Sequence, residues 1–187
     1  EKFGRPVLTF IDTPGAFPGV ASEERGISQA IAESMKLFSG LRTPVVATVL
    51  GEGGSGGAIA IGIADVILMM ENAYYSVITP EGCASILLRD ASKARESAAL
   101  LKLTPKDLLG CRVIDRIVEE PSGGAHRDPA TAAAALKAAI LESLPALDRT
   151  PLDALLADRS TRFLGLGAFS EQETERRSVL GWIKGLF

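Results

Sequence analysis

The glycine-rich segment at residues 51–57 (GEGGSGG) constrains the fold of this chain most, because five of its seven residues are glycine. It follows residues 44–50 (PVVATVL), which predict a buried strand, and it precedes residues 58–64 (AIAIGIA), which predict an apolar helix start. Glycines at such a turn let a ligand approach the backbone and leave amide N–H groups free to converge. The segment therefore predicts an α/β fold with a binding site at this turn.

The rest of the chain alternates strand and helix patterns, which favours α/β layers joined by crossover connections. Ser22 is the predicted N-cap of a helix whose apolar spacing continues to about residue 40. Asp128 is the predicted cap of an alanine-rich helix that ends near residue 144. Further strands are predicted at residues 7–11, 66–70, 74–78 and 113–118, and further helices at residues 79–88, 92–102, 105–110, 151–163 and 171–186.

A chain of 187 residues with 47% hydrophobic and 23% charged residues is expected to fold around one core. We expect a core at residues 1–149 and a helical tail at residues 150–187. Only six residues precede the first strand pattern, so we expect the chain to be part of a longer protein.

Charge and cysteine content exclude several classes of protein. The net charge of −3 argues against a general nucleic-acid binder, which carries a basic face. Cys83 and Cys111 are too few for a four-cysteine zinc site and indicate a reducing, cytoplasmic location. The N-terminus lacks a signal-peptide pattern, and the apolar stretch at residues 53–70 contains Asp65 and five glycines, which indicates buried core and no membrane span. No metal site is expected.

The same glycines fit two nucleotide-binding patterns only in part. Gly51-x-Gly53-x-x-Gly56 matches a dinucleotide fingerprint, with Glu71 placed to bind a ribose. Glu52, however, would lie beside the pyrophosphate, and the following helix is short for a crossover. Residues 12–15 (DTPG) resemble a GTPase magnesium loop, but the chain has no phosphate loop ending in Gly-Lys-Ser/Thr.

A serine hydrolase is a further alternative. Gly53-x-Ser55-x-Gly57 matches a nucleophile elbow, and Asp90 or Asp115 followed by His126 would complete a triad. This hypothesis depends on His126, because it is the only histidine in the chain. The simpler interpretation is that Ser55 is a small residue in a crowded turn and that His126 caps the next helix.

An oxyanion site is the interpretation that needs neither histidine nor cysteine. Amide N–H groups at the glycine turn, together with the positive end of the following helix, can stabilise a developing negative charge. One such donor contributes on the order of 3–4 kcal/mol to lowering a barrier.

Four motifs, in order, resemble the carboxyltransferase alpha-subunit family of bacterial and plastid acetyl-CoA carboxylases. They are IDTPGAFPGVASEERG, PVVATVLGEGGSGGAIAIG, YYSVITPEGCASIL and VIDRIVEEPSGGAHRDP, and the resemblance covers about residues 5–168. It implies a crotonase-like fold of stacked ββα units. It also implies transfer of a carboxyl group from carboxybiotin to acetyl-CoA, which gives malonyl-CoA for fatty acid biosynthesis.

The resemblance also implies partners. The family's alpha subunit supplies the biotin side of a site shared with a beta subunit, which supplies most of the acyl-CoA side and carries a zinc ribbon. Biotin arrives on the biotin carboxyl carrier protein, biotin carboxylase completes the complex, and the expected carboxyltransferase assembly is alpha2beta2. No nucleic-acid or membrane partner is implied. An assembly subunit of the same fold without turnover stays an alternative.

By match to the family, the backbone N–H groups of Gly56 and Gly57 are the predicted oxyanion hole for biotin. Several of the remaining candidates also have a purely structural interpretation, in turn geometry or helix capping. The predicted substrate-binding residues are Gly15, Ala16, Gly19, Gly53, Gly54, Ser55, Glu81 and Gly82.

Overall fold

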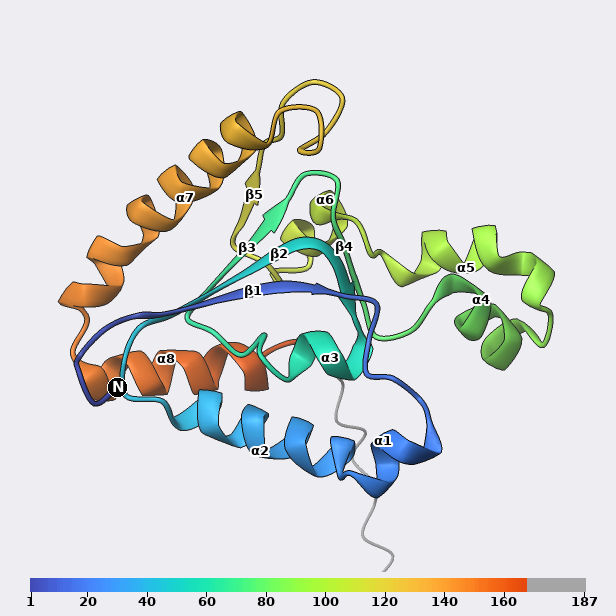
Figure 1. Cartoon of the computed structure of the whole chain (residues 1–187), viewed down its shortest axis with the longest axis horizontal. Helices are drawn as coiled ribbons and strands as arrows, with labels where there is room; N and C mark the ends of the chain where they lie inside the picture. The colour runs from blue at the N-terminus through green and yellow to red at the C-terminus, as the bar shows by residue number, and fades with distance from the viewer. Residues whose placement is uncertain (168–187) are drawn as a thin grey trace, which may run out of the picture.

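The computed structural model describes residues 1–167, which fold around a five-stranded parallel sheet (Figure 1). The strand order is β1-β2-β3-β5, and β4 pairs with the far end of β2. Because parallel strands need crossover connections, helices lie between most of the strands along the chain. The strands are β1 (Val7–Thr13), β2 (Val45–Gly54), β3 (Val66–Met70), β4 (Tyr74–Ser76) and β5 (Arg116–Val118).

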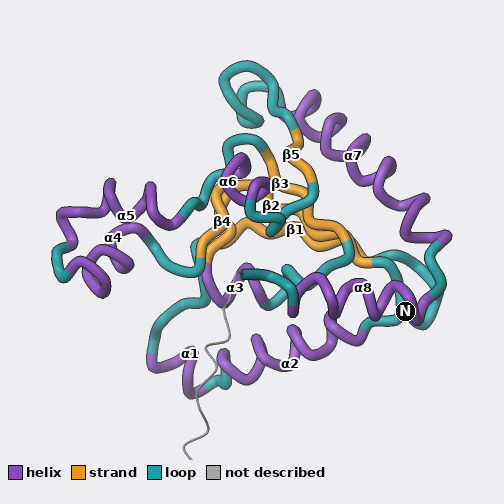
Figure 2. The backbone as a smooth tube through the Cα atoms, turned by 180° about the vertical axis from the view of Figure 1, so that it is seen from behind, coloured by secondary structure: helices purple, strands orange, loops and turns teal. Residues whose placement is uncertain are grey.

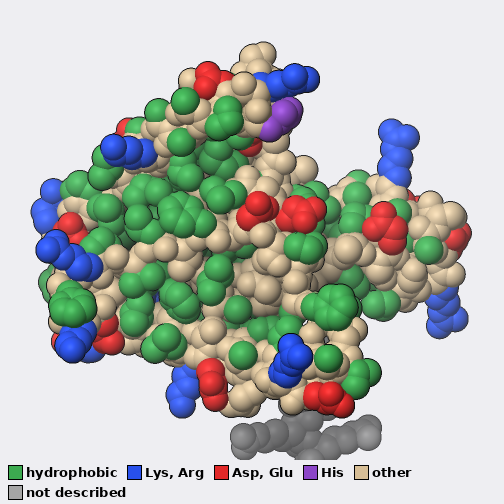
Figure 3. All heavy atoms as spheres, viewed as in Figure 1, with side chains coloured by type: hydrophobic (Ala, Val, Ile, Leu, Met, Phe, Trp, Pro, Cys, Tyr) green, Lys and Arg blue, Asp and Glu red, His purple; other side chains and the backbone are tan. Residues whose placement is uncertain are grey.

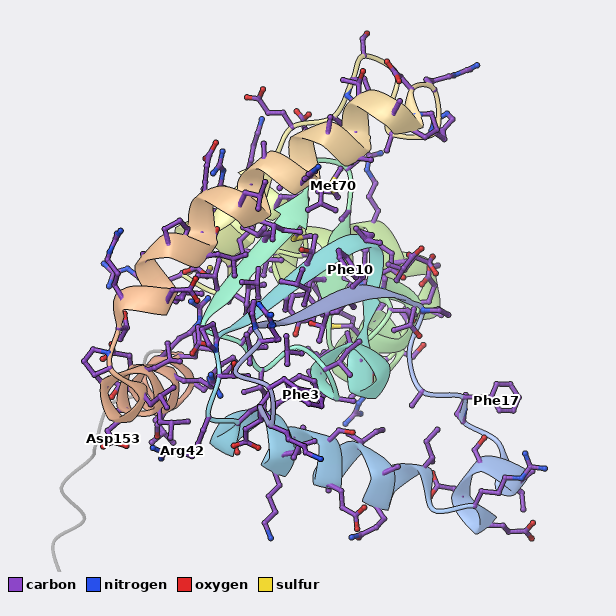
Figure 4. All side chains as sticks on the ribbon, turned by 60° about the vertical axis from the view of Figure 1, so that its left-hand side comes forward. Phe3, Phe10, Phe17, Arg42, Met70 and Asp153 are labelled. Carbon is purple, nitrogen blue, oxygen red and sulfur yellow. The ribbon has the colours of Figure 1, made fainter. Side chains whose placement is uncertain are left out.

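Strand β2 lies at the centre of the core. Its residues 45–49 are buried on both faces, as expected for an inner strand of a parallel sheet. Strand β1 instead alternates, with Ile11 fully buried while Leu8 and Phe10 are exposed on the other face. Phe10 is labelled in Figure 4. The hydrophobic core therefore centres on β2 and β3.

Two groups of helices cover the sheet (Figures 1 and 2). Helices α2 (Ile27–Gly40), α3 (Ser55–Ile59) and α8 (Leu152–Leu164) lie on one side, and α6 (Pro105–Gly110) and α7 (Pro129–Arg149) lie on the other. By length and composition, α7 is the one helix among residues 1–167 that could cross a membrane. It packs on β3 and β5 and buries Ala132, Ala139 and Ile140 there, as a core helix does.

Helix α8 is fastened to the sheet by two arginine–aspartate pairs. Asp65 and Asp115 immediately precede β3 and β5, and each accepts a 2.7 Å hydrogen bond from the backbone N–H of a neighbouring strand. Arg159 binds both carboxylate oxygens of Asp65 at 2.8 Å, and Arg162 binds Asp115 at 2.7 and 2.8 Å. Arg159 also donates to the carbonyls of Phe38, Leu41 and Thr43. The first part of the predicted tail is therefore tied to the core, and the helix predicted at 171–186 lies outside the described residues.

Several predicted boundaries are wrong: the strands predicted at 74–78 and 113–118 are only Tyr74–Ser76 and Arg116–Val118, and the helix predicted to start at residue 58 is Ser55–Ile59. Three further differences have a clear structural cause. The first helix is divided into α1 (Val20–Glu24), capped by Gly19 instead of Ser22, and α2, because Gly26 between them has the left-handed φ of 76°. Strand β2 continues through Gly54, since its glycine end pairs with β4. Helix α7 continues through Pro145 to Arg149.

A helical arm projects from the body between β4 and α6. It consists of α4 (Pro80–Cys83), the π-helical turn η1 (Ala84–Leu88), the 3-10 turn η2 (Ala91–Lys93) and α5 (Ala94–Leu101). We call these elements the arm; they lie at the right of Figure 1.

Candidate functional site

A cavity of about 610 Å³ lies where β1, β2 and β4 end. The carboxyl ends of parallel strands are the usual place for ligand sites in open α/β sheets. The cavity is lined by Pro14, Gly15, Ala16, Pro18, Gly54, Ser55, Tyr74, Ser76, Val77, Ile78, Thr79, Pro80, Glu81 and Leu103.

The loop after β1 packs directly on the glycine turn. A Cβ atom on Gly54 would overlap the carbonyl group of Pro14, and one on Gly57 would lie 3.0 Å from the carbonyl carbon of Gly15. The contact at Gly54 is closer than real Cβ atoms approach backbone atoms, and the contact at Gly57 could form only if the backbone of Gly15 shifted by a few tenths of an ångström. Glycine is therefore required here because two backbone segments meet, and their meeting forms one wall of the cavity.

Helix α3 begins at this wall with its first backbone amides unpaired. The hydrogen bonds of residues 1–167 include no acceptor for the N–H groups of Gly56 and Gly57. In a helix these groups point toward the N-terminal end, which here is formed by the cavity residues Gly54 and Ser55. Ser55 has a φ of 45°, uncommon for a residue with a side chain. The turn can thus present a positive backbone surface to an anion.

Two carboxylates lie close to the cavity residue Tyr74. Asp12 Oδ1 accepts a 3.0 Å hydrogen bond from the backbone N–H of Glu52, and both carboxylates lie near Tyr74. Burial raises the pKa of the Tyr74 hydroxyl, and the negative charges of Glu52 and Asp12 raise this pKa further. Tyr74 therefore stays protonated as a neutral hydrogen-bonding group at the cavity wall.

The structure brings five of the predicted site residues to this cavity: Gly15, Ala16, Gly54, Ser55 and Glu81. The remaining five do not line it. Gly56 and Gly57 lie behind the wall, where a Cβ atom on Gly56 would contact the side chains of Ile31 and Ala16.

Three predicted binding residues have structural positions. Gly53 lies within the sheet, paired with Tyr75. Gly19 caps α1, and the N–H of Gly82 donates to Thr79 Oγ1 at 3.1 Å in the cap of α4.

The sequence prediction missed the wall formed by Tyr74, Ser76, Val77, Ile78 and Leu103. Tyr74 and Ser76 could have been found from the register of β4, because they lie opposite Glu52 and Gly54 of the glycine turn. Leu103 gave no local signal, since its carbonyl reaches Tyr75 only through the fold.

The residues of the serine hydrolase triad do not meet. Ser55 lines the cavity described above, whereas His126 lines a separate one with Glu71 and Glu120. Asp115 is held by Arg162 and by the N–H of Ile67, and Asp90 caps η2. The structure therefore gives no support to the serine hydrolase hypothesis.

Among the described residues, the structure also gives no support to either nucleotide-binding pattern. Glu71, the proposed ribose ligand of a dinucleotide site, instead accepts a hydrogen bond from the N–H of Glu120. Within residues 1–167, no group of three or more His, Cys, Asp or Glu side chains is arranged to hold a metal ion.

Comparison with known proteins gives consistent matches. A family model described as acetyl co-enzyme A carboxylase carboxyltransferase-like matches residues 1–167. A Thermus thermophilus protein named acetyl-coenzyme A carboxylase carboxyl transferase subunit alpha is 55% identical over 91% of this chain and 55% of its own length. A Xanthomonas campestris protein of the same name is 53% identical over 90% of this chain and 53% of its own length. The chain spans about half the length of the curated relatives it matches.

Solved structures share the fold at low sequence identity. A Pseudomonas malonate decarboxylase hetero-tetramer in complex with coenzyme A superposes with a TM-score of 0.69 at 19% identity, over 97% of this chain and 66% of that one. Transcarboxylase 12S superposes with a TM-score of 0.56 at 18% identity, over 92% of this chain and 30% of that one. These likenesses confirm the predicted crotonase-like α/β class.

Proposed function

The chain belongs to the acetyl-CoA carboxylase carboxyltransferase-like family, and from that membership we propose that it is the core of a carboxyltransferase alpha subunit. In this proposal it takes part in moving the carboxyl group of carboxybiotin to acetyl-CoA, which gives malonyl-CoA for fatty acid biosynthesis. The observation that carries the proposal is the pair of unpaired amides at Gly56 and Gly57 behind a cavity at the strand ends.

The residues around the cavity fit the bicyclic ring system of biotin, whose ureido oxygen takes up negative charge as the carboxyl group leaves. Carboxybiotin, when bound, supplies the carboxyl group and then the base that takes a proton from the methyl group of acetyl-CoA. The N–H groups of Gly56 and Gly57 would stabilise the negative oxygen that forms as the carboxyl group leaves. Gly54 supports this role, because its missing side chain lets the loop at Gly15 close the wall.

The side walls would hold and orient the bound group. Val77, Ile78 and Leu103 offer apolar contact, while the protonated Tyr74 hydroxyl offers a hydrogen bond. Ser55 would serve by its shape and backbone position, not as a nucleophile. Fixed orientation of two bound substrates supplies much of the remaining acceleration.

The proposed function requires partners. We propose a beta subunit that supplies the acyl-CoA side and carries the zinc ribbon, a biotin carboxyl carrier protein, and biotin carboxylase in the full complex. An alpha2beta2 assembly in the cytoplasm is the expected form.

Replacing Gly57 with alanine tests the oxyanion hole. Its Cβ atom would press on the carbonyl carbon of Gly15 at 3.0 Å and displace the amide. We expect the transfer of the carboxyl group from malonyl-CoA to biocytin, measured after reconstitution with a beta subunit, to fall by about 100-fold.

Gly110→Ala is the matched control, because nothing lies within 4 Å of its added Cβ atom. It should keep full activity. Full activity in Gly57→Ala, with the beta subunit still bound, would overturn the assignment.

A further inference from the structure

The arm packs almost entirely on itself. Its helices α4 and α5 contact each other and the turns η1 and η2. Among the described elements, no helix or turn of the arm packs to a similar extent on a strand or helix of the body. It buries Cys83, Ala84 and Ser97 in its own interior. Figures 1 and 2 both show the arm standing away from the sheet. The arm is therefore a separate packing unit attached to the body.

Two short connectors attach this unit. They are joined at their base by a 3.1 Å hydrogen bond from the N–H of Tyr75 to the carbonyl of Leu103. Beyond this bond the first connector turns at Ser76, whose hydroxyl donates to the carbonyl of Ile78 at 2.7 Å. The second begins at Lys102, which has a left-handed φ of 50°. The connectors, residues 77–79 and 102–104, contain no helix or strand, and short segments of this kind can absorb a rotation.

The candidate cavity lies between the two units. The body contributes the loop at residues 14–18 and the turn at Gly54 and Ser55, while the arm and its first connector contribute residues 76–81. A rotation of the arm about its connectors would therefore change the width of the cavity directly.

Apolar side chains are exposed on both sides of the cavity mouth. On the body side, Phe17 is 72% exposed and lies between the lining residues Ala16 and Pro18. Figure 4 shows its ring extending away from the rest of the molecule. On the other side, Val77 is 72% exposed, and Ile86 and Leu87 extend the apolar surface along η1. Figure 3 shows hydrophobic side chains on the arm and on the region around α1 below it.

We propose that the arm is a lid that rotates on its connectors and closes over the cavity. On closure, Val77 of the first connector and Ile86 and Leu87 of η1 pack against the loop that carries Phe17. Closure removes Phe17 and Val77 from water, and this burial favours the closed form. Exclusion of water would also strengthen the hydrogen bonds that the amides of the turn make to a bound anion. The proposal concerns the shape of the cavity and goes beyond the proposed reaction.

Distance measurement between two spin labels tests the lid. One label is placed on the body at Lys36→Cys and one on the arm at Arg95→Cys, both exposed positions. The background carries Cys111→Ser to remove the exposed thiol, while Cys83 is buried. The control pair, Lys36→Cys with Lys137→Cys, lies wholly on the body. We expect a broad arm–body distribution with a short-distance component, and a narrow distribution for the control pair.

Phe17→Ser separates closure from ligand binding. It should remove the short-distance component in the free protein, whereas Phe3→Ser, at a residue that is 80% exposed and outside the cavity, should leave it unchanged. Saturating biocytin should enrich the same component in the parent protein. If biocytin fails to bind by calorimetry, the proposed function is in error, and the response to Phe17→Ser still decides the lid. A single narrow arm–body distance that Phe17→Ser leaves unchanged would overturn it.

Discussion

At the scale of single residues, Arg159 shows how a buried charge can organise a fold. Its side chain is 1% exposed, and its guanidinium group makes five hydrogen bonds, to Asp65 and to three backbone carbonyls. Such a group stabilises the fold only while every partner stays in place, because either charge alone would be buried without compensation. Its partners lie at the end of α2, in the segment that follows α2, and immediately before β3, so this side chain of α8 joins separate parts of the chain.

Replacing Arg159 with methionine should therefore be strongly destabilising. The substitution keeps the apolar stem but leaves Asp65 buried at 4% exposure without its partner. We expect the free energy of unfolding, measured in urea, to fall by about 3–5 kcal/mol. Arg42→Met is the control, because its pair with Asp153 is exposed, and a change below about 1 kcal/mol is expected. Similar effects for the two variants would contradict this account.

Glu120 provides a pH-dependent contact at the residue scale. Burial raises the pKa of its carboxyl group, but the stronger combined effect of hydrogen bonds from Asn72 and Ala125 and of nearby His126 leaves this pKa below its usual value. Because the folded pKa is depressed, the stabilisation is present above the unfolded pKa and is lost as pH falls through the folded value.

We therefore expect the loop at residues 121–127 to loosen on acidification. The amide of Ala125, which donates to Glu120 at 2.7 Å, should show faster hydrogen exchange in acid than the intrinsic rate predicts. Glu120→Gln should show reduced protection already at neutral pH. Equal, pH-independent protection in both proteins would refute the role of the carboxylate.

At the scale of elements, the sequence predicted strands and helices well wherever local pattern and burial agree. The strand at residues 66–70 was predicted as it occurs, because it is an unbroken apolar run. The end of β2 was not, since Gly53 and Gly54 carry no strand propensity and are extended because Thr13 and β4 pair with them. Except for Glu81, the arm side of the cavity was missed, because its residues reach the glycine turn only through the fold.

Helix α7 contains the clearest conflict between local preference and structure. Pro145 lies inside it, although proline supplies no backbone N–H and disfavours a helix interior. We expect Pro145→Ala to raise the free energy of unfolding by about 1–3 kcal/mol, since alanine restores the missing donor. Pro151→Ala should instead lower it by up to about 1 kcal/mol, because Pro151 caps α8 at a φ of −56° that already suits proline. Urea unfolding of both variants tests the opposite signs.

At the scale of the whole molecule, residues 1–167 form a body with one continuous core and an arm with a small interior of its own. The core cluster contains residues from β1, β2, β3 and α7 but none from the arm. Units that share little buried surface can open separately, each at its own free energy. The stability of the body should therefore be largely independent of the arm.

Amide hydrogen exchange should resolve these two units. We expect the amides of α5 to exchange faster than those of β2 and β3, because the arm has less buried surface to hold it closed. Arg159→Met, which weakens the body, should accelerate exchange in β2 and β3 toward the global rate and leave α5 nearly unchanged. If α5 instead slowed and accelerated together with the sheet, the arm would unfold only with the body. Its apparent separation would then be a matter of shape and not of cooperativity, because independent opening requires that few stabilising contacts cross the two connectors.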